Sequence, residues 1–227
     1  MNKGIWDQND YIGFNNCTNF NIGQITMDHD IGKYLYNTAK DSSITSILEV
    51  GTWNGRGSTR CIAEGLAARN KYAKPCIFYS LECNTDKCML AQELYASHPN
   101  IHILNEVFIN DKPADIEEIF PELTVNSQYA YWNNVDFDNM KNKPLFLNRT
   151  DLPEMFDMVL LDGGEFTTWY EYLAIRDRCK ILALDDTNVM KCKRIVQELK
   201  AQPERWEILI ENMHERNGNV VAKRIDI

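Results

Sequence analysis

The chain contains the stretch Ile-Leu-Glu-Val-Gly-Thr-Trp-Asn-Gly-Arg-Gly-Ser at residues 47–58. The apolar run over residues 44–50 predicts a buried strand that ends at Gly51, and residues 58–67 have the spacing of a helix. Glycines in such a turn let the backbone approach a ligand, and the first N–H groups of the helix attract a carboxylate or phosphate. We therefore expect a binding site at this turn, with a glycine turn that holds no ligand as the alternative.

The same alternation of strand and helix continues along the chain. Strands are predicted over residues 75–81, 101–104, 156–161 and 181–184, and helices over 86–96, 168–178 and 191–200. Two last strands, over 206–211 and 220–225, are joined around Asn217-Gly218, a tight-turn dipeptide. The pattern predicts a mostly parallel sheet that ends in an antiparallel hairpin.

Length and residue distribution predict one domain over residues 1–227. Residues 1–43 form an N-terminal arm with a helix over 30–40, and residues 111–153 form an insertion rich in aromatic, Asn and Asp residues. A segment of that length inside a domain is more often a binding lid than an idle loop, so we expect a substrate lid.

Composition excludes several classes of protein. The formal charge of −9 disfavours nucleic acid as a partner, because an acidic surface repels phosphate. No apolar run is long enough to cross a membrane, and no signal peptide is recognisable. Seven cysteines without a C-x-x-C pair indicate reduced thiols. We expect a cytoplasmic protein with a small-molecule partner, and predict no oligomeric state.

Glu82 ends the second predicted strand, about thirty residues after Gly51. An acidic side chain at this position can accept hydrogen bonds from both hydroxyls of a ribose. The dinucleotide fingerprint G-x-G-x-x-G is not matched, since from Gly55 its last position is Arg60. NAD is therefore disfavoured as the cofactor, and another compound that contains a nucleoside is favoured.

Two runs, Glu49-x-Gly51-x-x-x-Gly55 and Ser80-Leu81-Glu82-x-Asn84, resemble motifs of the class I S-adenosylmethionine-dependent methyltransferases, in particular the small O-methyltransferases of the catechol type. The resemblance covers about residues 44–110 and 155–225. It implies a Rossmann-like α/β fold whose seven-stranded, mostly parallel sheet has helices on both faces and a C-terminal antiparallel hairpin.

Cofactor contacts follow from the resemblance residue by residue. It implies that the turn from Gly51 to Gly55 holds the methionine part of S-adenosylmethionine, that Glu49 orients its ammonium group, and that Glu82 binds the ribose. Asn105 and Glu106 would lie near the adenine. Ser58 would contact the carboxylate, and Trp53 is either a pocket wall or a core residue. The implied cofactor site comprises Glu49, Gly51, Thr52, Trp53, Gly55, Ser58, Glu82, Asn105 and Asp162.

Four acidic residues end the two strands that follow the insertion: Asp162, Glu165, Asp185 and Asp186. Carboxylates gathered at one rim repel one another unless a cation or raised pKa values offset their charge, and oxygen ligands of this kind suit Mg²⁺. The alternative is that Asp185 and Asp186 cap the following helix and that Asp162 closes a turn.

The acidic residues also resemble those of metal-dependent O-methyltransferases that act on catechols and sugars. The resemblance implies metal ligation by Asp162, Asp185 and Asp186. Glu165 stands where sugar-modifying members often have a His that is a candidate base. Either Glu165 deprotonates the hydroxyl, or metal coordination alone lowers the pKa of the hydroxyl enough, or Glu165 only anchors the substrate. The predicted catalytic residues are Asp162 and Glu165.

We therefore predict an S-adenosylmethionine-dependent O-methyltransferase that acts on a hydroxyl of a small acceptor, such as a sugar or glycan, assisted by a divalent cation such as Mg²⁺. Aromatic and acidic residues of the insertion fit stacking on a sugar ring and bonding to its hydroxyls, or alternatively a folded loop core: Tyr129, Tyr131, Trp132, Asp136 and Asp138. The alternatives are a methyltransferase-like binding module without turnover and a nicotinamide-dependent oxidoreductase.

Overall fold

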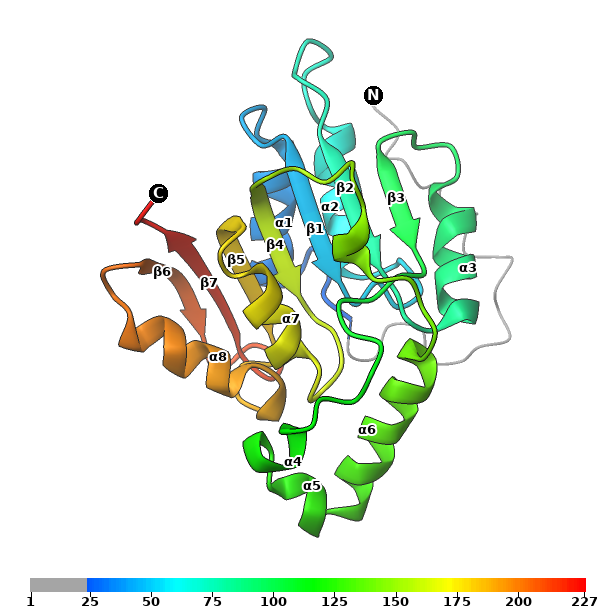
Figure 1. Cartoon of the computed structure of the whole chain (residues 1–227). Helices are drawn as coiled ribbons and strands as arrows, with labels where there is room; N and C mark the ends of the chain where they lie inside the picture. Colours follow the sequence, from blue (N-terminus) through cyan, green and yellow to red (C-terminus); the bar gives the residue numbers. More distant parts are fainter. Residues whose placement is uncertain (1–23) are drawn as a thin grey trace.

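Seven strands of the described residues form one sheet in the order β3-β2-β1-β4-β5-β7-β6 (Figure 1). The structure is a computed structural model that describes residues 24–227; Cys17 and the first part of the predicted N-terminal arm lie outside the described residues. Strands β1 to β5 run parallel, and β7 lies antiparallel between β5 and β6. The strands are β1 (Ser46–Val50), β2 (Ile77–Leu81), β3 (Ile101–Leu104), β4 (Phe156–Leu161), β5 (Cys179–Asp185), β6 (Trp206–Asn212) and β7 (Asn219–Arg224). The predicted fold class is confirmed.

Helices cover both faces of this sheet (Figure 1). They are α1 (Asp30–Lys40), α2 (Ser58–Ala67), α3 (Thr85–Tyr95), α4 (Ile116–Ile119), α5 (Glu122–Val125), α6 (Ser127–Met140), the 3₁₀ helix η2 (Phe146–Asn148), α7 (Thr168–Ile175) and α8 (Met190–Ala201). No helix among residues 24–227 is long and apolar enough to cross a membrane.

The central strands β1 and β4 are buried on both sides because each side packs against helices. Ile47 of β1 belongs to the core that contains Ile31 of α1 and Ile62 of α2. The next residue, Leu48, points the other way and belongs to the core of α7 and α8, which includes Tyr172. This two-residue alternation in a buried strand gives a continuous apolar run in the sequence, as predicted for β1.

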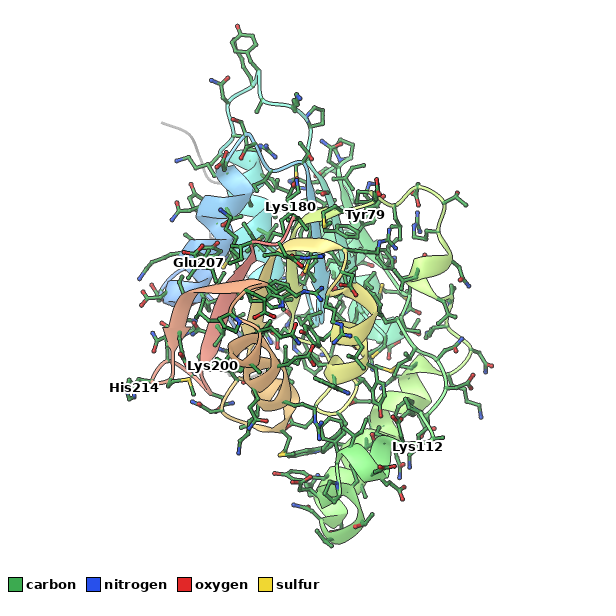
Figure 2. The ribbon with its side chains drawn as sticks, turned by 60° about the vertical axis from the view of Figure 1, so that its left-hand side comes forward. Tyr79, Lys112, Lys180, Lys200, Glu207 and His214 are labelled. Atoms are coloured by element: carbon green, nitrogen blue, oxygen red, sulfur yellow. The ribbon has the colours of Figure 1, made fainter. Side chains whose placement is uncertain are left out.

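The insertion forms α4, α5, α6 and η2, and α6 extends beyond the carboxyl ends of the strands (Figure 1). In Figure 2, Lys112 of the insertion lies in the lower part of the molecule and Lys180, near the start of β5, in the upper half. The insertion thus lies at the edge of the sheet where a substrate lid would be placed, and its role as a lid remains a prediction.

The hairpin of β6 and β7 differs from the predicted two-residue turn. Its strands are connected by residues 213–218, and Gly218 adopts a positive φ of 84°. The carbonyl groups of Asn217 and Gly218 accept hydrogen bonds from the backbone N–H groups of Asn188 and Thr187. The longer loop is therefore held against the end of β5, which no local turn rule predicts.

The carboxyl ends of β1 and β4 approach closely at Gly51. This glycine has a φ of 99°, and a Cβ atom there would lie 2.1 Å from the carbonyl oxygen of Asp162. After this point the chain passes from β1 to α2 on one face of the sheet and from β4 to α7 on the other. Such a divergence between neighbouring parallel strands leaves a crevice where α/β sheets bind ligands.

We predict that Gly51→Ala lowers the free energy of unfolding by about 2–4 kcal/mol, because it combines an unfavourable φ with a backbone collision. Gly55→Ala is the matched control: its φ is 75°, but the new Cβ would first meet side-chain atoms of Ala91 and Tyr95 at 3.0 Å. Urea unfolding of both variants measures the difference. If both variants lost the same free energy of unfolding, the close approach of β4 to Gly51 would contribute nothing to the cost of Gly51→Ala.

Candidate functional site

A cavity of about 590 Å³ lies at the carboxyl ends of the parallel strands, around the junction of β1 and β4. Its volume is within the range of small-molecule sites, and it exceeds that of a cavity of about 370 Å³ at the opposite end of the sheet. The loops after the strands contribute Gly51, Trp53, Glu82, Asn84, Glu106 and Asp162. Helices α6, α7 and α8 contribute Val135, Asp136, Asn139, Met140, Glu171 and Lys191.

Glu82 lines this cavity beside the glycine turn. Its Oε2 atom accepts a hydrogen bond from the backbone N–H of Trp53 at 2.6 Å, and its Oε1 atom accepts one from the backbone N–H of Asn84 at 2.8 Å. Burial raises the pKa of Glu82 to about 7, although both N–H groups act in the opposite direction. The carboxylate therefore connects the first and second strand ends at the position predicted for ribose binding.

Trp53 stands between the two glycines of the turn with a φ of 53°, which is unusual for a bulky residue. Its side chain is 47% exposed, and the Lys87 ammonium lies 4.3 Å from its ring centroid. Of the two predicted roles for Trp53, the structure therefore favours the cavity wall over the core.

Three other residues of the predicted cofactor site lie behind the turn and do not line the cavity. Glu49 is fully buried, and its Oε2 atom accepts hydrogen bonds from Thr59 Oγ1 at 2.7 Å and Ser80 Oγ at 2.5 Å. Ser58 also contacts Glu49, and Thr52 Oγ1 is 2.5 Å from Ser80 Oγ. Glu49, Thr52 and Ser58 thus support the turn from below, because period-two alternation directs Glu49 toward α2.

Asn105 also has a supporting position. Its Nδ2 atom donates a hydrogen bond to the backbone oxygen of Glu82 at 2.6 Å, and its Oδ1 atom accepts one from Lys143 Nζ at 2.5 Å. Glu106, the other residue predicted to lie near the adenine, does line the cavity, and so does Phe108. Asn105 therefore orients the end of β2, and an adenine would meet its neighbours.

The structure brings together the three aspartates at the ends of β4 and β5. One carboxylate oxygen each from Asp162, Asp185 and Asp186 lies within 4.8 Å of the others. Two cations pair with this cluster. Lys191 Nζ lies 2.5 Å from Asp162 Oδ1 and 2.8 Å from Asp186 Oδ2, and Arg216 Nη2 lies 2.7 Å from Asp185 Oδ2.

The charges of this cluster depend on one another. Burial raises the pKa of Asp162 to about 7, and Lys191 acts in the opposite direction. Burial by itself would lower the pKa of Lys191, but the carboxylates of Asp162 and Asp186 outweigh it and raise that pKa well above its ordinary value. Lys191 therefore remains an ammonium ion at neutral pH.

The predicted divalent cation does not fit this arrangement. Carboxylate oxygens are suitable ligands for Mg²⁺, which binds them at about 2.0–2.1 Å. Here one oxygen of Asp162 and one of Asp186 already bind the ammonium group of Lys191, and Asp185 binds Arg216. The sequence argument for a metal assumed carboxylates without a cation of their own, and it missed these two residues.

Glu165, the predicted base, does not line the cavity. It is half-buried near the start of α8, where burial raises its pKa while the charge of Lys191 and the backbone N–H groups of Lys191 and Met190 act in the opposite direction. Glu165 therefore interacts with the N-terminus of α8, a helix that is not its neighbour along the chain.

Asp136 of α6 and Glu171 of α7 are two acidic residues that sequence reasoning did not assign to catalysis. A Cβ atom at Gly163 would lie 2.5 Å from Glu171 Oε2, and one at Gly164 would lie 2.5 Å from Asp136 Oδ2. Burial raises the pKa of Asp136 to about 6 and that of Glu171 to about 7. The sequence pointed to Asp136 only as a partner for sugar hydroxyls. For Glu171 the signal was the glycine pair, which indicates a close neighbour without naming it.

The aromatic residues predicted to stack on a sugar lie elsewhere. Tyr129 packs against Phe166 and Trp132, and Tyr131 is 62% exposed. None of Tyr129, Tyr131 and Trp132 is among the described residues that line the cavity. The structure therefore supports the loop-core alternative for Tyr129.

No protein-family model matches the sequence, and no curated protein does. Solved structures share its architecture. An O-methyltransferase from Bacillus cereus in complex with SAH is 13% identical, with a TM-score of 0.55 over 89% of this chain and 83% of that chain. An SAH-bound methyltransferase from Podospora anserina is 14% identical, with a TM-score of 0.51 over 86% of this chain and 78% of that one.

This chain has the class I methyltransferase fold. The antiparallel β7 between β5 and β6, which the sequence analysis expected from the resemblance, is part of the shared architecture. In this methyltransferase fold the cavity lies at the strand junction where a ligand is expected.

We predict that Glu171→Gln stabilises the protein at pH 8 but not at pH 5. The unfolded carboxyl group has a pKa near 4.5 and the folded one a pKa of about 7. Between these two pKa values the folded state binds more protons than the unfolded state. Glu171 therefore destabilises the folded protein increasingly as the pH rises through this range, and the full effect is reached above it. Removing the charge should raise the melting temperature at pH 8 by several degrees.

The measurement is thermal unfolding of the wild type and Glu171→Gln at both pH values, with the exposed Glu207→Gln (Figure 2) as the matched control. If Glu171→Gln changed the melting temperature equally at pH 5 and pH 8, the charge of Glu171 would not be the cause of the change.

Proposed function

We propose that this chain transfers the methyl group of S-adenosylmethionine to a hydroxyl oxygen of a small acceptor. The observation that carries the proposal is the position of Glu82, in the cavity at the β1–β4 junction of a methyltransferase fold. Its carboxylate lies where the second strand ends, beside a glycine turn, which is the arrangement expected for binding a ribose.

We assign the cofactor to the part of the cavity between the glycine turn and Glu82. Gly51 and Trp53 would border its methionine part, and Glu106 and Phe108 its adenine. The bound cofactor supplies an electrophilic methyl group on a sulfonium. The excess of carboxylates around the cavity favours a cofactor that carries positive charge.

We assign the acceptor to the part of the cavity lined by α6. Asp136 and Asn139 provide polar groups for the hydroxyls of a sugar or glycan, the acceptor class that we propose, and Val135 and Met140 provide apolar contacts. Among the described residues, no donor bonds the carboxylate of Asp136, whose pKa of about 6 suits a base at neutral pH. We therefore assign proton removal to Asp136 rather than to Glu165.

No divalent cation enters this proposal, because Lys191 and Arg216 already pair with the predicted ligands. We also propose that the protein acts in the cytoplasm without a nucleic-acid partner, in keeping with its net charge of −9.

We predict that the wild type binds S-adenosylmethionine and SAH in isothermal calorimetry and does not bind NAD. Binding of the adenosyl compounds followed by methyl transfer to sugars would support the proposal. Binding without transfer to any acceptor would favour the binding module, and binding of NAD alone would contradict the cofactor assignment.

We predict that Glu82→Gln weakens SAH binding by about tenfold or more, because the amide replaces one acceptor oxygen by a donor. Calorimetry measures the affinity, and thermal unfolding verifies that the variant is folded. Glu207→Gln, on the exposed side of β6, should bind as the wild type does. Unchanged affinity in Glu82→Gln would remove the ribose role.

A further inference from the structure

Lys191 is the second residue of α8, and its side chain is only 8% exposed. Its ammonium group lies 2.5 Å from Asp162 Oδ1 and 2.8 Å from Asp186 Oδ2, between the ends of β4 and β5. Burying a charged lysine is costly unless it is paired and hydrogen-bonded, and here two carboxylates provide both. The position is therefore built by the surrounding chain and is not a chance surface contact.

The surrounding contacts hold the two aspartates in place. Asp186 adopts a φ of 57°, and its Oδ1 atom accepts a hydrogen bond from Asn217 Nδ2 at 2.9 Å. Arg216 binds Asp185, the third aspartate of the cluster. Asn217 and Arg216 both belong to the hairpin loop that is held against β5, so this loop helps to define where the ammonium group lies.

One donor of the ammonium group remains for a ligand. An ammonium ion has three N–H bonds, of which two point to Asp162 and Asp186. The third has no acceptor among residues 24–227, and Lys191 lines the cavity together with Asp162 and Asp136. A ligand oxygen in that part of the cavity is a suitable partner for it.

We propose that Lys191 is a catalytic residue that takes the place of a divalent cation, donating a hydrogen bond to the acceptor oxygen. This inference rests on the proposed function. In the reaction, the acceptor O–H bond breaks and its proton passes to Asp136, while the oxygen forms a bond to the methyl carbon. The bond between sulfur and methyl breaks with its electron pair moving to sulfur, which leaves SAH. Lys191 stabilises the negative charge that develops on the oxygen.

The first test asks whether the ammonium group occupies the cation position. Mn²⁺ is titrated into the full chain and followed by electron paramagnetic resonance, for the wild type and Lys191→Met. Removal of the ammonium group leaves the carboxylates of Asp162 and Asp186 without a cationic partner and free to bind a metal ion. The variant should therefore bind Mn²⁺ more tightly than the wild type, by about tenfold or more. Tighter binding by the wild type, or equal binding, would overturn the proposal.

Lys180→Met is the matched control. Lys180 also pairs with an aspartate, Asp157, at a distance of 2.7 Å. This pair lies near the start of β5, away from the insertion (Figure 2). This variant should bind Mn²⁺ as the wild type does. Lys191→Arg, which keeps the positive charge, should also resemble the wild type. If Lys191→Met does not fold, Lys191→Gln, which also removes the charge, replaces it.

The second test measures methyl transfer from S-adenosylmethionine to 3,4-dihydroxybenzoate and to a panel of free sugars, in EDTA and in Mg²⁺. The wild type should be equally active in both, and Lys191→Met should lose about a hundredfold in kcat with SAH affinity unchanged. Activity that requires Mg²⁺ would overturn the role of Lys191. Failure of the wild type to bind SAH would overturn the proposed function, while the Mn²⁺ titration would still decide whether Lys191 occupies the cation position.

Discussion

The close approach of β1 and β4 is the constraint on which the rest of the site depends. Gly51 permits it, because any side chain there would collide with the backbone of Asp162. The two strands then send their connections to opposite faces of the sheet, and the cavity forms where they diverge. Glu82 on one side and Asp162 on the other reach the same space because the parallel strands end in register.

A second constraint is electrostatic. Carboxylates from four strand ends and two helices surround the cavity, and burial raises the pKa of Glu82, Asp136, Asp162 and Glu171. The chain offsets part of this charge with Lys191 from α8 and Arg216 from the last hairpin. The site combines groups whose pKa lies near neutrality with a fixed cation, which suits proton removal from a hydroxyl group.

The supporting residues explain why several motif positions are distant from the cavity. Glu49, Thr52 and Ser58 form polar contacts beneath the glycine turn, and Asn105 holds the backbone of Glu82. Their side chains shape the site without forming its wall. A motif can therefore identify the correct turn while the roles of its individual residues follow from side-chain direction.

The sequence by itself determined the sheet and the edge where the site lies, because apolar runs, helical spacing and glycine turns are local signals. It also predicted that Asp162, Asp185 and Asp186 would meet, since neighbouring parallel strands end at one edge. Only the tertiary structure decided how their charge is balanced. Lys191 and Arg216 come from a helix and a loop whose direction depends on packing, and a solvated charge and a buried one look the same in a sequence.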